Sequence, residues 1–116
     1  MRVISRQTLK TFHEKCKAQN DYKALKGAVD SWYAEVKKAN WKNSSDVKAN
    51  FATASVISSD RIVFNIKGND YRLVVAVHYR RKIVFIKWIG THKDYEKINA
   101  KEVSYGNQTS KNTCRS

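Results

Sequence analysis

The stretch FNIKGNDYRLVV, residues 64–75, joins two apolar runs through a Gly-Asn-Asp segment. Runs of β-branched and aromatic residues on both sides of such a turn predict a β-hairpin. The stretch also carries two cations, Lys67 before the turn and Arg72 after it. An ion that is buried in an apolar core without a partner is strongly destabilising. The hairpin therefore needs a group or solvent that neutralises or hydrates both cations.

The segments around this hairpin predict an antiparallel sheet preceded by helices. Residues 54–67, 69–79 and 82–90 are rich in β-branched and aromatic residues and are separated by short turn signals. Upstream, apolar residues recur at helical spacing in residues 6–18 and 21–39, with Ser5 and then Asn20 or Asp21 as expected caps. Residues 1–4 form an edge strand or an entry segment, and residues 46–50 allow one helical turn. After the last strand, Thr91 is the expected cap of a short helix.

These elements define an α+β fold in which N-terminal helices pack on one face of an antiparallel sheet and a short C-terminal helix follows. A chain of 116 residues is long enough for one compact domain and too short for two ordinary ones. Residues 1–100 are predicted to form this single domain, and residues 101–116 a polar C-terminal tail.

The charge of the chain indicates an anionic partner. The 23 Lys and Arg residues against 10 Asp and Glu residues give a formal net charge of +13, which favours encounter with polyanions. An anionic membrane is the weakest candidate, because no apolar run approaches the roughly 18 residues of a spanning helix and the N-terminus lacks a secretory signal. Two cysteines, Cys16 and Cys114, are too few for a disulfide framework and do not form a CxxC motif. We expect a cytoplasmic protein.

Strand parity predicts which face carries the cations. With a two-residue loop, even-numbered residues of the first strand share a face with odd-numbered residues of the second. The core face then holds Ile62, Phe64, Ile66, Tyr71, Leu73, Val75 and Val77, and the other face holds Arg61, Val63, Asn65, Lys67, Arg72, Val74, Ala76 and His78. A second two-residue loop at residues 80–81 adds Val84, Ile86 and Trp88 to the core face.

The same parity places Ile83, Phe85, Lys87 and Ile89 on the other face, with Ile89 opposite Arg72. Lys67, Arg72, Lys87 and His92 then converge at one end of the sheet, exposed to a groove. Opposed cations repel each other unless an anion lies between them. An open basic groove with a histidine at its rim suits a phosphodiester.

These side chain types fit ribonuclease chemistry. RNA carries its own nucleophile, the 2′-OH, so cleavage needs a proton acceptor, a cation for the phosphorane and a proton donor. Arg72 can clamp phosphate oxygens bidentately. His92 is the expected general acid, because histidine changes charge near neutral pH. Lys67 supplies further charge or acts as the base. No metal or cofactor is needed, and the three histidines lie far apart without carboxylate or thiol neighbours.

The runs VFNIKGNDYRLVVAV and VFIKWIGTHKDYEKI resemble the HigB family of type II toxin-antitoxin toxins. The shared features are a Phe-Asn strand, a Gly-Asn turn, Tyr-Arg-Leu and a later Gly-Thr-His-x-x-Tyr. They are strongest over residues 61–98, and the N-terminal part is also similar to the family through residue 60. By motif position, Arg72 and His92 fall on the catalytic places that the resemblance implies, with Lys67 and Tyr95 as helpers.

The resemblance implies a RelE-like toxin fold and an mRNA interferase, an endoribonuclease that cuts translated message on the ribosome and so inhibits translation. It also implies a DNA-binding antitoxin of the HigA type that forms a hetero-oligomer with the toxin. We expect the message to be bound by four further residues: Arg61, Asn65, Lys87 and Tyr95.

Two alternatives remain open. The first is a noncatalytic toxin resembling ParE, which blocks a topoisomerase by binding. A binding-only toxin needs no proton donor, so His92 beside Arg72 favours the nuclease. The second is a basic RNA-binding module without cleavage, which is disfavoured because most aromatic residues fall on the predicted core face.

Overall fold

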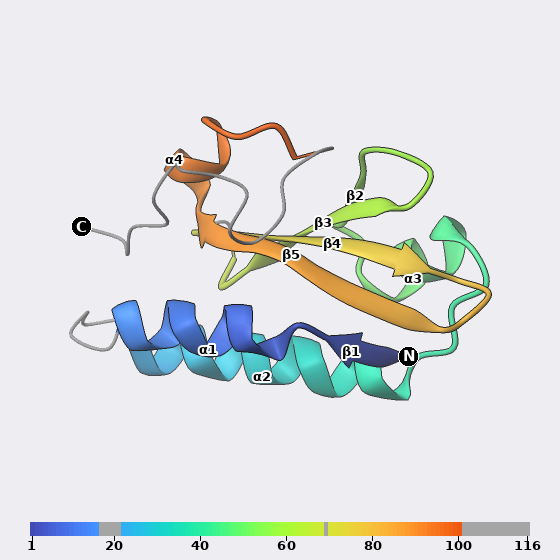
Figure 1. Ribbon diagram of the computed structural model, residues 1–116, viewed down its shortest axis with the longest axis horizontal. Helices are drawn as coiled ribbons and strands as arrows, with labels where there is room; N and C mark the ends of the chain where they lie inside the picture. The colour runs from blue at the N-terminus through green and yellow to red at the C-terminus, as the bar shows by residue number, and fades with distance from the viewer. Residues whose placement is uncertain (17–21, 69, 101–116) are drawn as a thin grey trace.

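The computed structural model describes residues 1–16, 22–68 and 70–100, which form a layer of helices against a twisted sheet (Figure 1). The elements in chain order are β1 (Arg2–Ile4), α1 (Arg6–Lys15), α2 (Tyr22–Lys38), α3 (Ser44–Asn50), β2 (Ser55–Val56), β3 (Arg61–Ile66), β4 (Tyr71–His78), β5 (Ile83–Thr91) and α4 (His92–Tyr95). The sheet order is β1-β5-β4-β3-β2. The α+β fold with N-terminal helices is thus confirmed.

The ends of the sheet differ in part from the predictions. The expected edge strand β1 forms, but it pairs with β5 in parallel, so the sheet is mixed and not wholly antiparallel. Ser5 precedes α1 with φ of 72°, and its side chain makes no capping hydrogen bond. The expected role of Ser5 as a cap is therefore wrong. The expected caps Asn20 and Asp21, and the predicted tail 101–116, lie outside the described residues.

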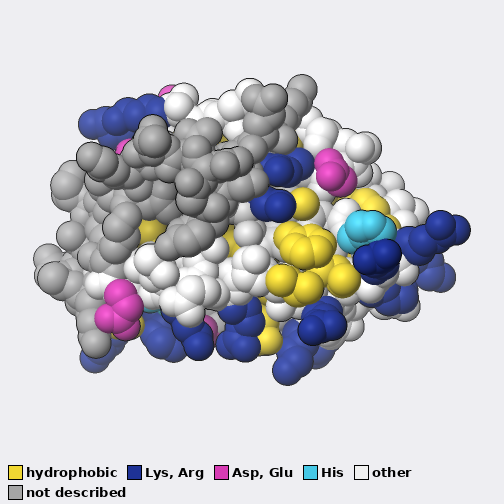
Figure 2. Space-filling view, in the orientation of Figure 1, with side chains coloured by type: hydrophobic (Ala, Val, Ile, Leu, Met, Phe, Trp, Pro, Cys, Tyr) yellow, Lys and Arg dark blue, Asp and Glu magenta, His cyan; other side chains and the backbone are white. Residues whose placement is uncertain are grey.

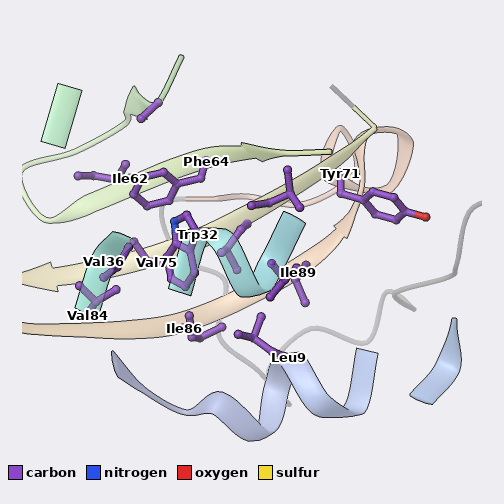
Figure 3. Packing of buried hydrophobic residues seen from close by; sticks show 14 of the residues in the cluster. Leu9, Trp32, Val36, Ile62, Phe64, Tyr71, Val75, Val84, Ile86 and Ile89 are labelled. Carbon is purple, nitrogen blue, oxygen red and sulfur yellow. The ribbon is translucent and has the colours of Figure 1, made fainter. Parts of the chain in front are cut away.

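The main core lies between the helix layer and the sheet. Apolar residues of α2 spaced three or four apart are buried on one face: Leu25, Val29, Trp32 and Val36. The ring centroid of Trp32 lies 5.4 Å from that of Phe64 on β3. From α1, Leu9 points toward Ile86 and Ile89 on β5 (Figure 3). Both helices therefore cover the same face of the sheet, as the sequence predicts.

The register of the first hairpin confirms its predicted parity. Ile66 pairs with Tyr71 and Phe64 with Leu73, and all four side chains are buried in the main core. The loop contains four residues, 67–70, and not two. Because an even number of loop residues preserves the alternation of faces, the difference in length leaves the side chains of β3 and β4 on their predicted faces. Lys67, which was expected on the same face as Arg72, lies instead in the loop outside both strands.

A bulge in β5 overturns the predicted parity of its last residues. Val75 pairs with Ile86 and Val74 with Trp88, so Lys87 is an extra residue in β5. An extra residue shifts every later side chain to the opposite face. Trp88 therefore leaves the core face where we expected it, and Ile89 enters the main core. The residue opposite Arg72 is Gly90, not Ile89.

The second face of the sheet is partly covered, which corrects the expectation of an open groove. Val63, Val74 and Trp88 are buried there in a second apolar cluster. Ile57, Tyr95, Ile98 and Ala100 pack against this cluster. Figure 1 shows α4 and residues 96–100 above this face, opposite the helix layer. The middle of this face is consequently apolar and covered, and it does not form a continuous basic groove.

Within the described residues, none of the helices has both the length and the apolar character needed to cross a bilayer.

Candidate active site

The short helix α4 brings His92 to the end of the sheet where β4 begins. Thr91 ends β5 and caps α4, because its Oγ1 accepts a hydrogen bond from the backbone N–H of Asp94 at 3.1 Å. His92 then donates its backbone N–H to the carbonyl oxygen of Asp70 at 3.0 Å. Since Asp70 precedes β4 and Tyr71 pairs with Thr91, His92 is held beside the start of that strand.

Arg72 lies at the same end, on the second face of the sheet. It is half-buried between Asn65 on β3 and Gly90 on β5. Its Cζ lies 5.8 Å from the centroid of the Tyr95 ring, a distance at which a guanidinium is attracted to an aromatic face. Tyr95 is about one turn of α4 after His92. One short helix therefore contacts Arg72 and also carries the histidine.

Lys67 has a carboxylate partner in its own loop. Its Nζ lies 2.9 Å from Oδ2 of Asp70, and the two side chains are 25% and 34% exposed. The loop can bring them together because Lys67 and Gly68 have left-handed backbones, with φ of 52° and 66°. Asp70 thus holds Lys67 through its side chain and His92 through its carbonyl. The β3–β4 loop therefore links Lys67 and His92, two of the three residues that are predicted to be catalytic.

The His92 imidazole faces a second carboxylate. Its Nε2 lies 3.6 Å from Oε1 of Glu96, one helical turn later, and the imidazole is 45% exposed. This distance is longer than a hydrogen bond, so the contact is an ion pair only when the imidazole is protonated. Its Nδ1 is buried and has no hydrogen-bond partner among the described residues. Glu96 is therefore placed to orient a histidine that solvent and substrate can reach.

Two of the predicted substrate-binding cations lie away from this group. Lys87 occupies the bulge and its Nζ lies 5.5 Å above the ring of Phe85, further from the site along β5. Arg61 donates a hydrogen bond to the carbonyl oxygen of Ala100 at 3.1 Å. Arg61 is also four residues from Asn65 on β3, or about 13 Å along the strand. The structure places Asn65 opposite Arg72, the Tyr95 ring beside Arg72, and both Lys67 and His92 in contact with Asp70. Arg61 and Lys87 lie apart from these contacts.

A depression on the second face lies beside the site. It is lined by Ile57, Tyr95, Glu96, Ile98, Asn99 and Ala100. Of the residues predicted to act on RNA, only Tyr95 lines it. The depression could accept a nucleotide next to the cationic end, but it does not itself contain the predicted catalytic cations.

Sequence reasoning missed both carboxylates of the site, Asp70 and Glu96. Each has a signal in the sequence. Asp70 follows Lys67 by three residues across a turn, and Glu96 follows His92 by four, a spacing at which helical side chains are neighbours. The prediction assigns the cations to an external anion, and it therefore omits these two carboxylates within the chain.

Loss of the α4 cap is expected to disturb the site as well as the stability. Thr91→Ala removes the hydroxyl that accepts from Asp94, and loss of an N-cap costs about 0.5–2 kcal/mol. Asn43→Ala is the matched control, because Asn43 caps α3 in the same way through a bond from the N–H of Asp46 at 3.1 Å. Thermal unfolding should show similar destabilisation in both variants, with reduced activity at equal protein level for Thr91→Ala alone. Equal activity of the two variants would mean that α4 does not position the site.

Helices on one face of a five-stranded sheet, with a short helix after the last long strand, have the architecture of a RelE-like toxin. The chain belongs to the HigB toxin family, described as the RelE-like toxic component of a toxin-antitoxin system, whose family model matches residues 25–98. It is therefore a toxin with an antitoxin partner. The match includes Lys67, Arg72, His92 and Tyr95 and begins within α2. A comparison with curated proteins gave no match.

Proposed function

We propose that this toxin is a ribosome-dependent mRNA endoribonuclease that inhibits translation. The observation that carries the proposal is the placement of Arg72 and His92 at one end of the sheet, joined by α4. RNA cleavage requires a cation that stabilises the charge of the phosphate and a group that transfers a proton. A guanidinium can serve as the first and an imidazole as the second. A toxin that acts only by occupying a partner has no use for this pair.

The proposed reaction is transesterification at a phosphodiester of the message. The 2′-oxygen attacks phosphorus, the bond to the 5′-oxygen breaks, and a 2′,3′-cyclic phosphate forms. Arg72 binds the non-bridging oxygens and stabilises their charge in the transition state. His92 donates a proton to the leaving 5′-oxygen, while the proton of the 2′-OH passes to a base.

The contacts around Lys67 support one of its two expected roles. A lysine held by a carboxylate at 2.9 Å is suited to be a fixed positive charge near the phosphate. Base catalysis would instead require the ammonium to give up its proton beside Asp70. We therefore assign charge stabilisation to Lys67, and base stacking to Tyr95, whose ring lies beside Arg72.

The proposed nuclease function and the toxin family predict two partners, the ribosome and an antitoxin. A net charge of +13 suits work on the ribosome, where phosphates of ribosomal RNA supply much of the binding free energy. Binding should therefore weaken steeply as salt is raised. The antitoxin is proposed to be a DNA-binding protein of the HigA type that forms a hetero-oligomer with the toxin.

The test is to map mRNA 5′ ends by primer extension after the toxin is induced in cells. We expect new ends within translated regions, and their loss with His92→Gln, which keeps a polar side chain but cannot transfer a proton. Removing a general acid typically costs about 10²–10⁴-fold in rate. His78→Gln is the matched control, because His78 is exposed at the other end of β4 and its loss should leave cleavage intact.

Other outcomes would contradict the proposal in distinct ways. Growth arrest without new mRNA ends, accompanied by DNA damage and stalled topoisomerase, would assign the toxin to the topoisomerase inhibitors. If His92→Gln cleaved mRNA as well as the wild type, the toxin would still be a nuclease, but His92 would not be its general acid.

A further inference from the structure

A pocket of about 200 Å³ lies between α1 and α2, away from the candidate active site. We call it the α1–α2 pocket. Its floor is formed by Leu9 from α1 and Val29 from α2, which are both buried. The helices cover one face of the sheet while α4 lies over the other (Figure 1). A partner in this pocket would therefore occupy a different layer of the molecule from the Arg72–His92 site.

Cations line the rim of the α1–α2 pocket. Arg6 and Lys10 approach it from α1, and Lys26 from α2. Figure 2 shows Lys and Arg side chains along the lower edge of the molecule, where Figure 1 places these helices. The one carboxylate in the lining is Asp30, whose Oδ2 lies 2.9 Å from Nζ of Lys26. Asp30 therefore offsets the charge of Lys26, and the charges of Arg6 and Lys10 make the rim positive.

The arrangement of Arg6 and Lys10 is unfavourable for the free helix. They are like charges four residues apart on one helix, a spacing at which they repel each other and destabilise the helix. They also lie in the N-terminal half of α1, which has no acidic residue in its first turn, whereas a helix N-terminus favours negative charge. A carboxylate bound between them would relieve both effects.

The walls of the pocket are aromatic and partly preorganised. The Arg6 guanidinium stacks over the Tyr33 ring, with Cζ 4.5 Å from its centroid, so its position is held before a ligand arrives. The His13 ring forms part of the lining, and its Nε2 is buried without a hydrogen-bond partner among the described residues. Burial lowers the pKa of His13, which favours the neutral ring. Turning of this ring would offer a hydrogen-bond donor to an occupant.

We infer that the α1–α2 pocket is a docking site for an acidic segment of the antitoxin, with an apolar side chain on Leu9 and Val29 and a neighbouring carboxylate between Arg6 and Lys10. This inference rests on the antitoxin partner that the family implies and not on RNA cleavage. An acidic peptide fits better than RNA for two reasons. The floor is apolar, and the volume of about 200 Å³ suits one side chain, whereas a phosphate backbone requires an open track of cations.

The test is calorimetric titration of the purified toxin with the purified antitoxin of the same toxin-antitoxin system. The variant Arg6→Glu/Lys10→Glu reverses the two rim charges. Its matched control is Arg80→Glu/Arg81→Glu, which makes the same change in net charge at two exposed residues of the β4–β5 loop. We expect Kd to rise at least tenfold in the pocket variant and to change less than threefold in the control. Arg6→Ala/Lys10→Ala should give an intermediate rise.

Thermal unfolding of each variant separates loss of binding from loss of fold. Without antitoxin, the pocket variant should still arrest growth, which distinguishes this inference from the proposed nuclease function. An unchanged Kd, or an equal rise in the pocket variant and the loop control, would overturn the inference. Normal antitoxin binding with weakened binding to ribosomes would assign the pocket to RNA, and would also overturn it.

Discussion

Arg72→Ala is expected to abolish growth arrest and to leave a folded toxin that still binds its antitoxin. The guanidinium is the proposed phosphate-binding group, at the end of the sheet where α4 begins with His92. Losing one group that stabilises transition-state charge typically lowers the rate by about 10²–10³-fold. Cleavage of a defined message on purified ribosomes is the direct measurement, and growth after induction is the cellular one.

Two further substitutions serve as comparisons for Arg72→Ala. Arg72→Lys keeps the charge but not the planar fork that binds two oxygens at once, so it should retain only part of the activity. Lys93→Ala removes an exposed cation of α4 and should behave as the wild type. If Arg72→Ala remained fully toxic at equal protein level, the assignment of the active site would be wrong.

Gly90→Ala is expected to cause the second large effect, through packing. A Cβ at this position would lie 2.5 and 2.6 Å from two carbon atoms of the Trp88 ring. Trp88 is only 3% exposed in the second apolar cluster, so it has little room to move. Overpacking of this kind costs about 1–3 kcal/mol. Denaturant unfolding should therefore show a clear loss of stability.

The same substitution should also reduce activity, because Gly90 is directly opposite Arg72 and Trp88 contacts Tyr95, with ring centroids 6.3 Å apart. Gly27→Ala is the matched control. A methyl group at Gly27 would meet no atom within 4 Å, and alanine in a helix is favoured over glycine by about 1 kcal/mol. The two changes should shift stability in opposite directions. A stable, active Gly90→Ala toxin would show that Trp88 does not support the site.

Much of the architecture could be predicted because it depends on patterns between neighbouring residues. The helical spacing of Leu25, Val29, Trp32 and Val36 identifies α2 and its buried face. The alternation through residues 61–78 identifies β3, β4 and the face that each side chain occupies. The predicted faces are correct although the loop has four residues instead of the expected two, because both numbers are even.

The β5 bulge could not be predicted in the same way. Trp88 and Ile89 are both apolar and both are buried, so their hydrophobicity does not show which faces the main core. The decision depends on the extra residue at Lys87 in the pairing with β4. The resulting displacement of Trp88 builds the second apolar cluster and closes much of the face that we expected to be open.

The sequence by itself determined the order of helices and strands, the hairpin with its cations, and the family to which the chain belongs, because periodicity and motif spacing are properties of neighbours along the chain. Only the tertiary structure decided that the carbonyl oxygen of Asp70 accepts from the N–H of His92, that Tyr95 lies beside Arg72, and that Arg61 and Lys87 lie apart from them. These outcomes depend on strand register and on where α4 packs. Both are set by the total burial and hydrogen bonding of segments distant in sequence, which no local pattern records.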